Sequence, residues 1–212
     1  MIAIVDYESG NVRAIQNILN RCGAASIITS EPSKIFSSSG VILPGVGNFS
    51  ACATKLDQSG LRQILVEYAV DRKLPLLGIC LGMQLLFESS EEGVNGVQGL
   101  GVLKGRVVKF SETENVAIRI PNIGWRDVRQ TTQGADIFGE APYRFYFTHS
   151  FHAPIDAMNA SIFNTTNGYE FPAGVVLRNI MGVQFHPEKS HVNGIRFFER
   201  YLAWVGSYRD RQ

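Results

Sequence analysis

The sequence predicts an α/β fold, with a mixed, largely parallel central sheet, flanking helices and an antiparallel second half. In the first half of the chain, short apolar runs alternate with helix-patterned segments, an order typical of parallel strands with crossover helices. In the second half, short strand-like runs follow one another closely. The length of 212 residues is that of about one domain with a substantial core, so we expect residues 1–212 to form a single domain.

The elements expected in the first half are strands at residues 2–6, 26–29, 40–43 and 74–79, helices at 11–22 and 61–72, and a loop at 44–48. The strands are short apolar runs, as buried parallel strands are. The first helix is expected because Val12, Ile15, Ile18 and Leu19 recur at helical spacing and share one face. The second helix has the same pattern at residues 61, 64, 65 and 68.

The elements expected in the second half are strands at residues 102–104, 107–110, 117–120, 143–147, 161–164, 174–177 and 182–185, and a closing helix at about 191–204. Such short, closely spaced strands favour antiparallel pairing. No internal repeat or low-complexity segment interrupts the chain.

The charge of the chain excludes a strong general attraction to polyanions. Twenty lysines and arginines nearly balance nineteen aspartates and glutamates, so we expect neither nucleic acid nor a membrane as partner. The N-terminus has no basic leader and an acid at position 6, which argues against a secretory signal and favours a cytoplasmic protein. The longest mainly apolar run, residues 74–87, contains a proline and is too short to span a bilayer.

Three cysteines, at positions 22, 52 and 80, give an odd count without the pairing typical of metal sites. We therefore expect no disulfide framework and at least one free thiol. We also expect no metal and no cofactor. Cys22 and Cys52 lie in helix-like stretches among small or apolar neighbours, where packing is the expected role. This leaves Cys80 as the candidate reactive thiol.

Cys80 stands where an apolar run ends at a glycine-flanked cysteine and a helix-patterned run begins. Glycines at 78 and 82 have a physical reason, because the turn that exposes a nucleophile between a strand and a helix leaves little room for a β-carbon. A helix that begins at the nucleophile favours the thiolate through its dipole. The pattern predicts that Cys80 is a nucleophile.

A nucleophilic cysteine needs a base, and the base needs a group that orients it. His186 falls where a predicted strand ends, and Glu188, two residues later, can turn back to bond the imidazole. The alternative is a histidine satisfied locally at a strand end beside a surface glutamate. Together with the cysteine turn, the pattern favours a Cys80, His186 and Glu188 triad.

Acyl transfer also needs donors for the oxyanion. The N–H of Leu81, directly after the nucleophile, is one candidate, and the loop containing Val46 and Gly47 offers another from a neighbouring strand end. By itself, that loop could equally be an ordinary turn.

The segments Gly-Ile-Cys-Leu-Gly-Met-Gln (78–84) and Gln-Phe-His-Pro-Glu (184–188) resemble the class I glutamine amidotransferases. The resemblance covers nearly the whole chain and implies a flavodoxin-like fold. It also implies that a Cys-His-Glu triad hydrolyses glutamine to glutamate and ammonia, which passes to a synthase.

Further segments resemble the glutaminase subunits of imidazole glycerol phosphate synthases: residues 4–7, 10–11, 43–49, 82–92, 124–125, 146–150 and 186–190. The resemblance implies that Gln84 and Glu92 hold the amide and amino ends of glutamine. It also implies that the strand end with Ser150 and Phe151 touches its carboxylate. From the residues alone, Glu92 could belong to a solvated acidic turn, and His149 and His152 are expected to be structural or rim residues.

The resemblance names the partner as a (β/α)8 cyclase subunit in a heterodimer of histidine biosynthesis, whose products are imidazole glycerol phosphate and an aminoimidazole carboxamide ribotide. Residues expected at the interface with this partner are Asn11, Asn122, Trp125, Tyr146 and Lys189. Three positions depart from the usual pattern of these subunits: Glu8 replaces a common glycine, Asn122 a histidine and Phe151 a frequent tyrosine. The subunit without its partner is expected to be nearly idle.

Other interpretations of the residues stay open. Residues 165–169 and 188–191 also resemble paralogues that feed ammonia to amidotransferases of bacterial surface-sugar synthesis. A thiol peptidase or esterase could use the same triad, although Gln84 and Glu92 would then have no shared purpose. A non-catalytic binding protein could keep the fold without the activity.

Overall fold

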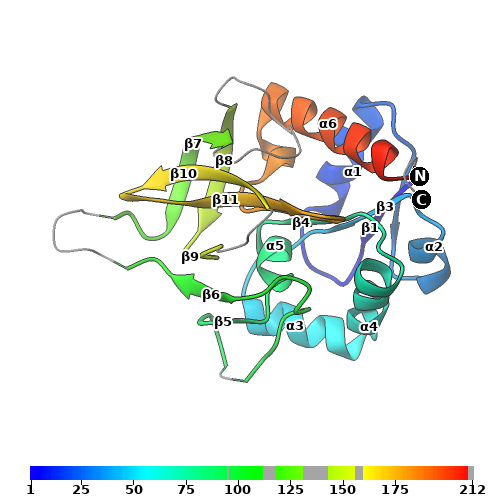
Figure 1. Ribbon diagram of the computed structural model, residues 1–212, viewed down its shortest axis with the longest axis horizontal. Coiled ribbons are helices and arrows are strands. Elements are labelled where there is room, and N and C mark those ends of the chain that lie inside the picture. The colour runs from blue at the N-terminus through cyan, green and yellow to red at the C-terminus, as the bar shows by residue number, and fades with distance from the viewer. Residues whose placement is uncertain (95, 112–117, 131–142, 156–159, 210–212) are drawn as a thin grey trace.

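The computed structural model describes residues 1–94, 96–111, 118–130, 143–155 and 160–209. Its strands are β1 (Ile2–Val5), β2 (Ser26–Thr29), β3 (Gly40–Leu43), β4 (Leu76–Ile79), β5 (Ser89–Ser90), β6 (Arg106–Lys109), β7 (Asn122–Gln130), β8 (Tyr143–His149), β9 (Phe151–His152), β10 (Ser161–Asn167), β11 (Tyr169–Leu177) and β12 (Ile180–Val183). Its α-helices are α1 (Val12–Arg21), α2 (Pro32–Phe36), α3 (Phe49–Gln58), α4 (Leu61–Val66), α5 (Leu81–Leu85) and α6 (His191–Arg209). Figure 1 shows their arrangement.

The main sheet runs in the order β2-β1-β3-β4-β12-β11-β10-β7-β8, and a smaller sheet has the order β5-β6-β9. The strands from β2 to β12 pair in parallel. Those from β12 to β8 pair antiparallel. The change from a parallel first half to an antiparallel second half is therefore confirmed.

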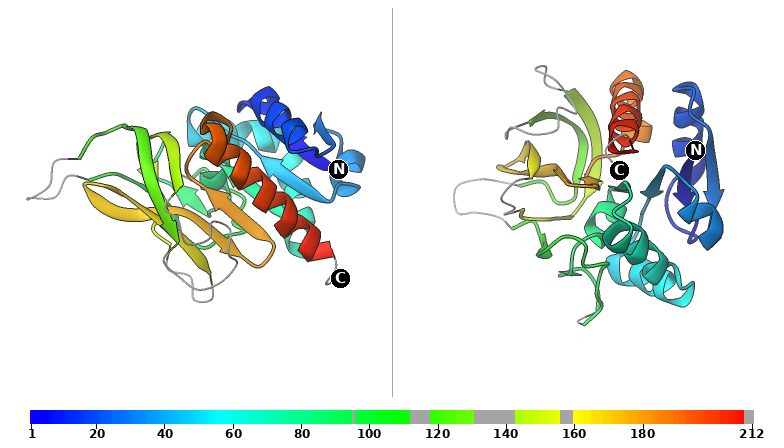
Figure 2. Two further views of the ribbon diagram at one scale, coloured as in Figure 1. Left: turned by 90° about the horizontal axis from the view of Figure 1, so that it is seen from above. Right: turned by 45° about the vertical axis from the view of Figure 1, so that its right-hand side comes forward.

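Helices cover both faces of the parallel strands. Helices α1 and α6 lie together on one face, and α3 and α4 lie on the other (Figures 1 and 2). Successive residues of β1 alternate between the two layers, as strand geometry requires: Ile2 and Ile4 pack with α1 and α6, whereas Ala3 and Val5 pack with α3 and α4. Strands β1, β3 and β4 are apolar throughout because both faces are covered.

The neighbouring strands β4 and β12 position the candidate site. They pair in parallel, with Ile79 beside Val183, and the N–H of Cys80 donates to the Val183 carbonyl at 2.8 Å. The chain that leaves β4 and the chain that leaves β12 therefore emerge at the same edge of the sheet, where α/β folds place their sites. This pairing brings residues 80 and 186 together across about a hundred positions of sequence.

The structure differs from the predicted elements in several places. Strands β5 and β7 and helices α2 and α3 were not predicted. Residues 102–104 form no strand, and neither do residues 118–120, while Ala117 lies outside the described residues. The predicted strand at 182–185 runs from Ile180 to Val183, and the predicted helix at 61–72 is α4 followed by a wider π-helical turn, Glu67–Asp71.

The reason for the missed β7 is its sequence. Its inward positions include Asn122 and Arg126, so the alternation of apolar and polar residues that indicates a strand is absent. Residues 102–104 are instead irregular, and the N–H of Leu103 bonds the Leu86 carbonyl at 2.9 Å.

In the described part of the chain, none of the helices combines the length and the hydrophobicity that crossing a membrane requires.

Candidate active site

Cys80 sits in a backbone conformation that L-residues rarely adopt, with φ 54° and ψ −111°. The two flanking glycines are sterically required. A β-carbon on Gly78 would lie 2.6 Å from the Gly82 carbonyl oxygen, and one on Gly82 would overlap the Leu43 carbonyl oxygen. The predicted sharp turn between a strand and a helix is therefore confirmed, with the sulfur held at its apex.

The helix after the nucleophile is shorter than the sequence pattern suggests. Helix α5 spans only Leu81–Leu85. Because few peptide dipoles add up in so short a helix, its dipole stabilises a Cys80 thiolate less than predicted. The N–H of Leu81 belongs to the first turn of α5, whose N–H groups have no partner within the helix. It stays available to an oxyanion beside Cys80.

His186 follows β12, and its backbone is fixed on two sides. Its N–H donates to the Tyr146 carbonyl at 2.8 Å, and the Ser190 hydroxyl donates to its carbonyl at 2.6 Å. The ring nitrogen Nδ1 lies 2.8 Å from Glu188 Oε1, and both side chains are about as buried as any in the protein, at 2% and 1% exposed. The sequence-predicted contact between Glu188 and His186 is thus present.

The electrostatics of this buried pair favour a charged imidazole. Burial lowers the pKa of His186, but the negatively charged form of the Cys80 sulfur and the Glu188 carboxylate outweigh it and raise the pKa to about 10. The ring atom Nε2, which does not face Glu188, forms no hydrogen bond with any described residue. An imidazolium with one free N–H next to Cys80 is the partner that a thiolate nucleophile needs.

A pocket of about 400 Å³ opens at Cys80. It is lined by Val46, Gly47, Cys80, Leu81, Gln84, Glu92, Thr148, His149, Ser150, Phe151, His186 and Lys189. All the residues proposed from sequence for the oxyanion and the substrate line it, together with Cys80 and His186. Thr148 was not predicted from the sequence, and Lys189 was expected at the partner interface rather than in the pocket.

The two polar residues proposed to hold the substrate are already partly engaged. Gln84 Nε2 donates to the Phe151 carbonyl and to Gln184 Oε1, each at 3.0 Å, so its Oε1 is the atom left for a substrate N–H. Glu92 Oε2 accepts from the N–H of Phe49 at 2.8 Å. Burial raises the pKa of Glu92, and the Phe49 N–H opposes that shift. Glu92 is therefore an anchored carboxylate in the pocket wall, not a solvated acidic turn.

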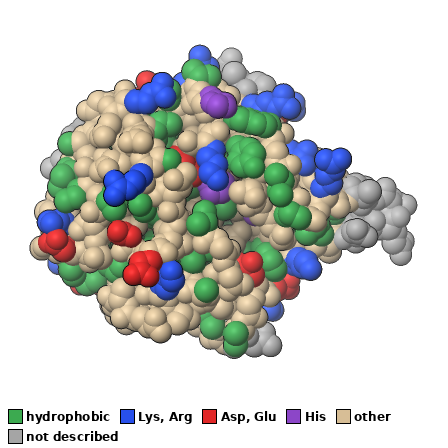
Figure 3. Space-filling view, turned by 180° about the vertical axis from the view of Figure 1, so that it is seen from behind, with side chains coloured by type: hydrophobic (Ala, Val, Ile, Leu, Met, Phe, Trp, Pro, Cys, Tyr) green, Lys and Arg blue, Asp and Glu red, His purple; other side chains and the backbone are tan. Residues whose placement is uncertain are grey.

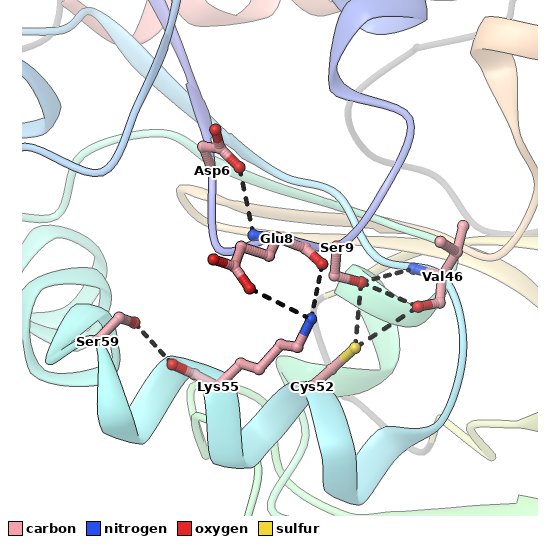
Figure 4. Close-up of polar contacts among 7 residues, drawn as sticks. All are labelled: Asp6, Glu8, Ser9, Val46, Cys52, Lys55 and Ser59. Carbon is pink, nitrogen blue, oxygen red and sulfur yellow. Dashed lines mark hydrogen bonds and ion pairs between the residues drawn. The ribbon is translucent and has the colours of Figure 1, made fainter.

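The loop expected to supply an oxyanion donor is clamped by Ser9 (Figure 4). The Ser9 hydroxyl donates to the Val46 carbonyl at 2.9 Å and accepts from the Val46 N–H at 3.3 Å. Cys52 Sγ lies 3.2 Å from the Ser9 hydroxyl oxygen. The Val46 N–H is therefore occupied in this arrangement. Gly47, whose φ is 105°, is left as the candidate donor of this loop.

Two further histidines near the pocket, His149 and His152, behave as structural residues. Burial lowers the pKa of His149 to about 3 and that of His152 to about 4, so both rings are neutral at pH 7. Cys22 and Cys52 are free thiols. Within the described part of the chain, no group of histidines, cysteines and acids is arranged to hold a metal ion.

Four of the five residues expected at a partner interface reach the surface, and the structure corrects the fifth. Asn11 and Lys189 are exposed, Trp125 is 37% exposed and Tyr146 is half-buried. Asn122 is fully buried and bonds His149 and Arg126, so it cannot itself touch a partner.

The Trp125 ring stacks on the His191 ring, with 5.3 Å between the ring centroids. Ile123 and Val192, which are close to these two residues in the sequence, are exposed hydrophobic residues. Figure 3 shows hydrophobic side chains gathered beside lysine, arginine and histidine on one face of the molecule. Ile123 and Val192 could not be identified from the sequence, because an exposed apolar residue in a strand or helix has the same local pattern as a buried one.

Comparisons with known proteins agree with this geometry. The family model "Glutamine amidotransferase class-I" matches residues 3–201. The chain is 43% identical over 207 residues to "Imidazole glycerol phosphate synthase subunit HisH" of Sulfurimonas denitrificans, covering 96% of this chain and 98% of the relative. It is 41% identical over 214 residues to the protein of the same name from Bacillus cereus, covering 100% and 99%.

Solved structures show the same fold at lower sequence identity. A crystal structure of a glutamine amidotransferase has a TM-score of 0.75 at 18% identity, covering 97% of this chain and 100% of that chain. The structure of PurLQS from Thermotoga maritima has a TM-score of 0.66 at 20% identity, covering 96% of this chain and 98% of that chain. With the family model spanning most of the chain and curated relatives matching it almost end to end, the chain belongs to the class I glutamine amidotransferase family.

Proposed function

We propose that this chain is the glutaminase subunit of an imidazole glycerol phosphate synthase. It hydrolyses L-glutamine to glutamate and ammonia and delivers the ammonia to a (β/α)8 cyclase subunit in a heterodimer. The observation that carries the proposal is the buried pair of His186 and Glu188 beside Cys80, in a pocket that also holds Gln84 and Glu92. The names of the full-length relatives support the choice of synthase.

In the proposed reaction, Cys80 Sγ attacks the carboxamide carbon of glutamine. His186 Nε2 donates its proton to the departing nitrogen, which leaves as ammonia, and a γ-glutamyl thioester remains. His186 then removes a proton from water, the hydroxide attacks the thioester, and glutamate leaves as the Cys80 thiolate and the His186 imidazolium are restored. Glu188 holds the imidazole orientation throughout, and the N–H groups of Leu81 and Gly47 stabilise the oxyanion.

The substrate assignment follows from the chemistry of the pocket. A free amino acid presents an ammonium group, for which the anchored carboxylate of Glu92 is a suitable partner. The Gln84 oxygen can accept from the substrate carboxamide. A peptidase or esterase would need neither group.

The ammonia must reach its acceptor before it is protonated in bulk water, so a tightly bound partner is required. We assign the exposed residues Trp125, Tyr146 and Lys189 to that contact, together with Asn11. The Lys189 Nζ lies 5.9 Å from the centre of the Tyr146 ring and at the pocket rim, so a partner bound there would also close the pocket.

Co-expression with the cyclase from the same organism tests the proposal. Supplied with the cyclase's nucleotide substrate, the complex is expected to form imidazole glycerol phosphate with either glutamine or ammonium chloride as the nitrogen source, whereas Cys80→Ser loses the glutamine-dependent reaction and keeps the ammonium-dependent one. The chain alone is expected to release little glutamate. Failure to support the cyclase, with activity instead toward a sugar amidotransferase, would assign the chain to the surface-sugar paralogues.

A further inference from the structure

A line of buried amide groups ends at the sulfur of Cys80. Gln184 Nε2 lies 3.7 Å from Cys80 Sγ, and Gln184 Oε1 accepts from Gln84 Nε2 at 3.0 Å. Gln84 Nε2 also donates to the Phe151 carbonyl at 3.0 Å. Gln184 is fully buried and Gln84 is 3% exposed, so water does not compete for these contacts.

The Phe151 carbonyl fixes the direction of every hydrogen bond in this line. A carbonyl oxygen only accepts, so the Gln84 atom that faces it must be the nitrogen. That nitrogen then requires an oxygen on Gln184, which turns the Gln184 nitrogen toward the sulfur. The orientation of Gln184 is thus set by the network and not by choice of rotamer.

The same carbonyl is held from its other side. His149 Nδ1 lies 2.7 Å from it and must carry the proton, because the acceptor has none to give. The low pKa of His149 keeps the ring neutral, so its other nitrogen accepts from Asn122 Nδ2 at 2.9 Å. Asn122 Oδ1 in turn accepts from Arg126 Nε at 3.1 Å, so the hydrogen-bond network ends at these two residues of β7.

We propose that Gln184 is a further catalytic residue, whose amide donates a hydrogen bond to the Cys80 thiolate, and that Gln84 and the Phe151 carbonyl position it. The proposal rests on the proposed function in that it takes Cys80 as the nucleophile. A donor at the sulfur stabilises the thiolate and fixes one of its lone pairs, which leaves another for the substrate carbon. Gln84 then has two tasks, with its nitrogen in the network and its oxygen toward the pocket.

The test is the pH dependence of Cys80 alkylation by iodoacetamide, which needs neither glutamine nor a partner. Digestion with trypsin gives the peptide 74–104, in which Cys80 is the only cysteine, so mass spectrometry follows it separately from Cys22 and Cys52. Gln184→Met keeps the length of the side chain and removes the donor. Gln63→Met, at an exposed position of α4, is the matched control.

At a pH below the wild-type midpoint, Gln184→Met is expected to slow alkylation about tenfold, because a hydrogen bond to a charged group is lost. The whole curve moves to higher pH while its plateau, where every thiol is ionised, stays unchanged. Gln84→Met, which leaves Gln184 with its donor but without its anchor, moves the curve in the same direction by less. Gln63→Met has no effect.

Coincident curves for wild type and Gln184→Met would overturn the inference, and so would a lower plateau without a shift, because that pattern indicates only a packing role. Should Gln184→Met fail to fold, an unshifted Gln84→Met curve overturns it equally. The proposed function has a separate failure: wild-type Cys80 reacting no faster than Cys22 would refute the nucleophile itself.

Discussion

Gly82→Ala is expected to destabilise the protein, although an alanine in a helix ordinarily stabilises it. Gly82 lies in α5, where the gain in helix propensity alone is about 1 kcal/mol. Its β-carbon would overlap the Leu43 carbonyl oxygen and lie 2.9 Å from the Leu43 carbonyl carbon and 3.1 Å from that of Pro44. These are backbone atoms at the end of β3, so no side-chain rotation relieves the contact.

The size of the effect follows from that geometry. Overpacking a tight site costs about 1–3 kcal/mol, and a clash with backbone belongs at the upper end. Subtracting the propensity gain of about 1 kcal/mol leaves a net loss of about 2 kcal/mol. The strain also displaces residues 44–47, so glutaminase activity is expected to fall with stability.

Guanidinium unfolding of the variant measures the loss as a lower midpoint at an unchanged m-value. The matched control is Gly206→Ala in α6, where a β-carbon meets nothing within 4 Å, and which is expected to stabilise the protein by about 1 kcal/mol. A Gly82→Ala protein as stable as wild type, or more so, would refute the steric account of the turn at Cys80.

Three further outcomes are expected. Glu188→Gln removes the carboxylate that orients His186, so kcat for glutamine hydrolysis is expected to fall about 100-fold or more with KM little changed, and an unchanged kcat would contradict the triad. Burial lowers the pKa of His149 to about 3, so between pH 6.5 and 3 this side chain binds a proton in the unfolded chain but not in the native protein. The free energy of unfolding therefore falls by about 1.4 kcal/mol per pH unit as the pH falls from 6.5 toward 3. His149→Gln is expected to flatten that slope in denaturant unfolding across pH, and an unaltered slope would show that the ring is not held neutral. Trp125→Ala is expected to weaken partner binding about thirtyfold in calorimetry while exposed Val70→Ala, the control, has no effect, and equal affinities would remove Trp125 from the interface.

The turn at Cys80 could be predicted from sequence because its cause is local. Glycines at 78 and 82 are needed by atoms within a few residues and by one neighbouring strand, so the pattern itself carries the geometry. The same holds for Glu188, which lies two residues from the imidazole that it bonds. That residues 1–212 form one domain stays a prediction.

Features that depend on distant partners could not be predicted. Asn122 looks like a surface residue in sequence, and only its bonds to His149 and Arg126 explain why it is buried. The burial of Gln184 could not be predicted either, since its hydrogen-bond partner Gln84 lies a hundred positions away in the sequence. Sequence patterns report polarity along one segment, whereas these polar groups are buried because a second segment satisfies their hydrogen bonds.

The central claim is that Cys80 attacks glutamine, and labelling with 6-diazo-5-oxo-L-norleucine, an electrophilic glutamine analogue, tests it most directly. In the presence of the cyclase, mass spectrometry is expected to find one adduct per chain in the peptide 74–104, and excess L-glutamine is expected to prevent it. Cys22 and Cys52 are expected to stay unlabelled. An adduct on either of them, or continued glutamate production by a chain whose Cys80 is fully labelled, would contradict the account.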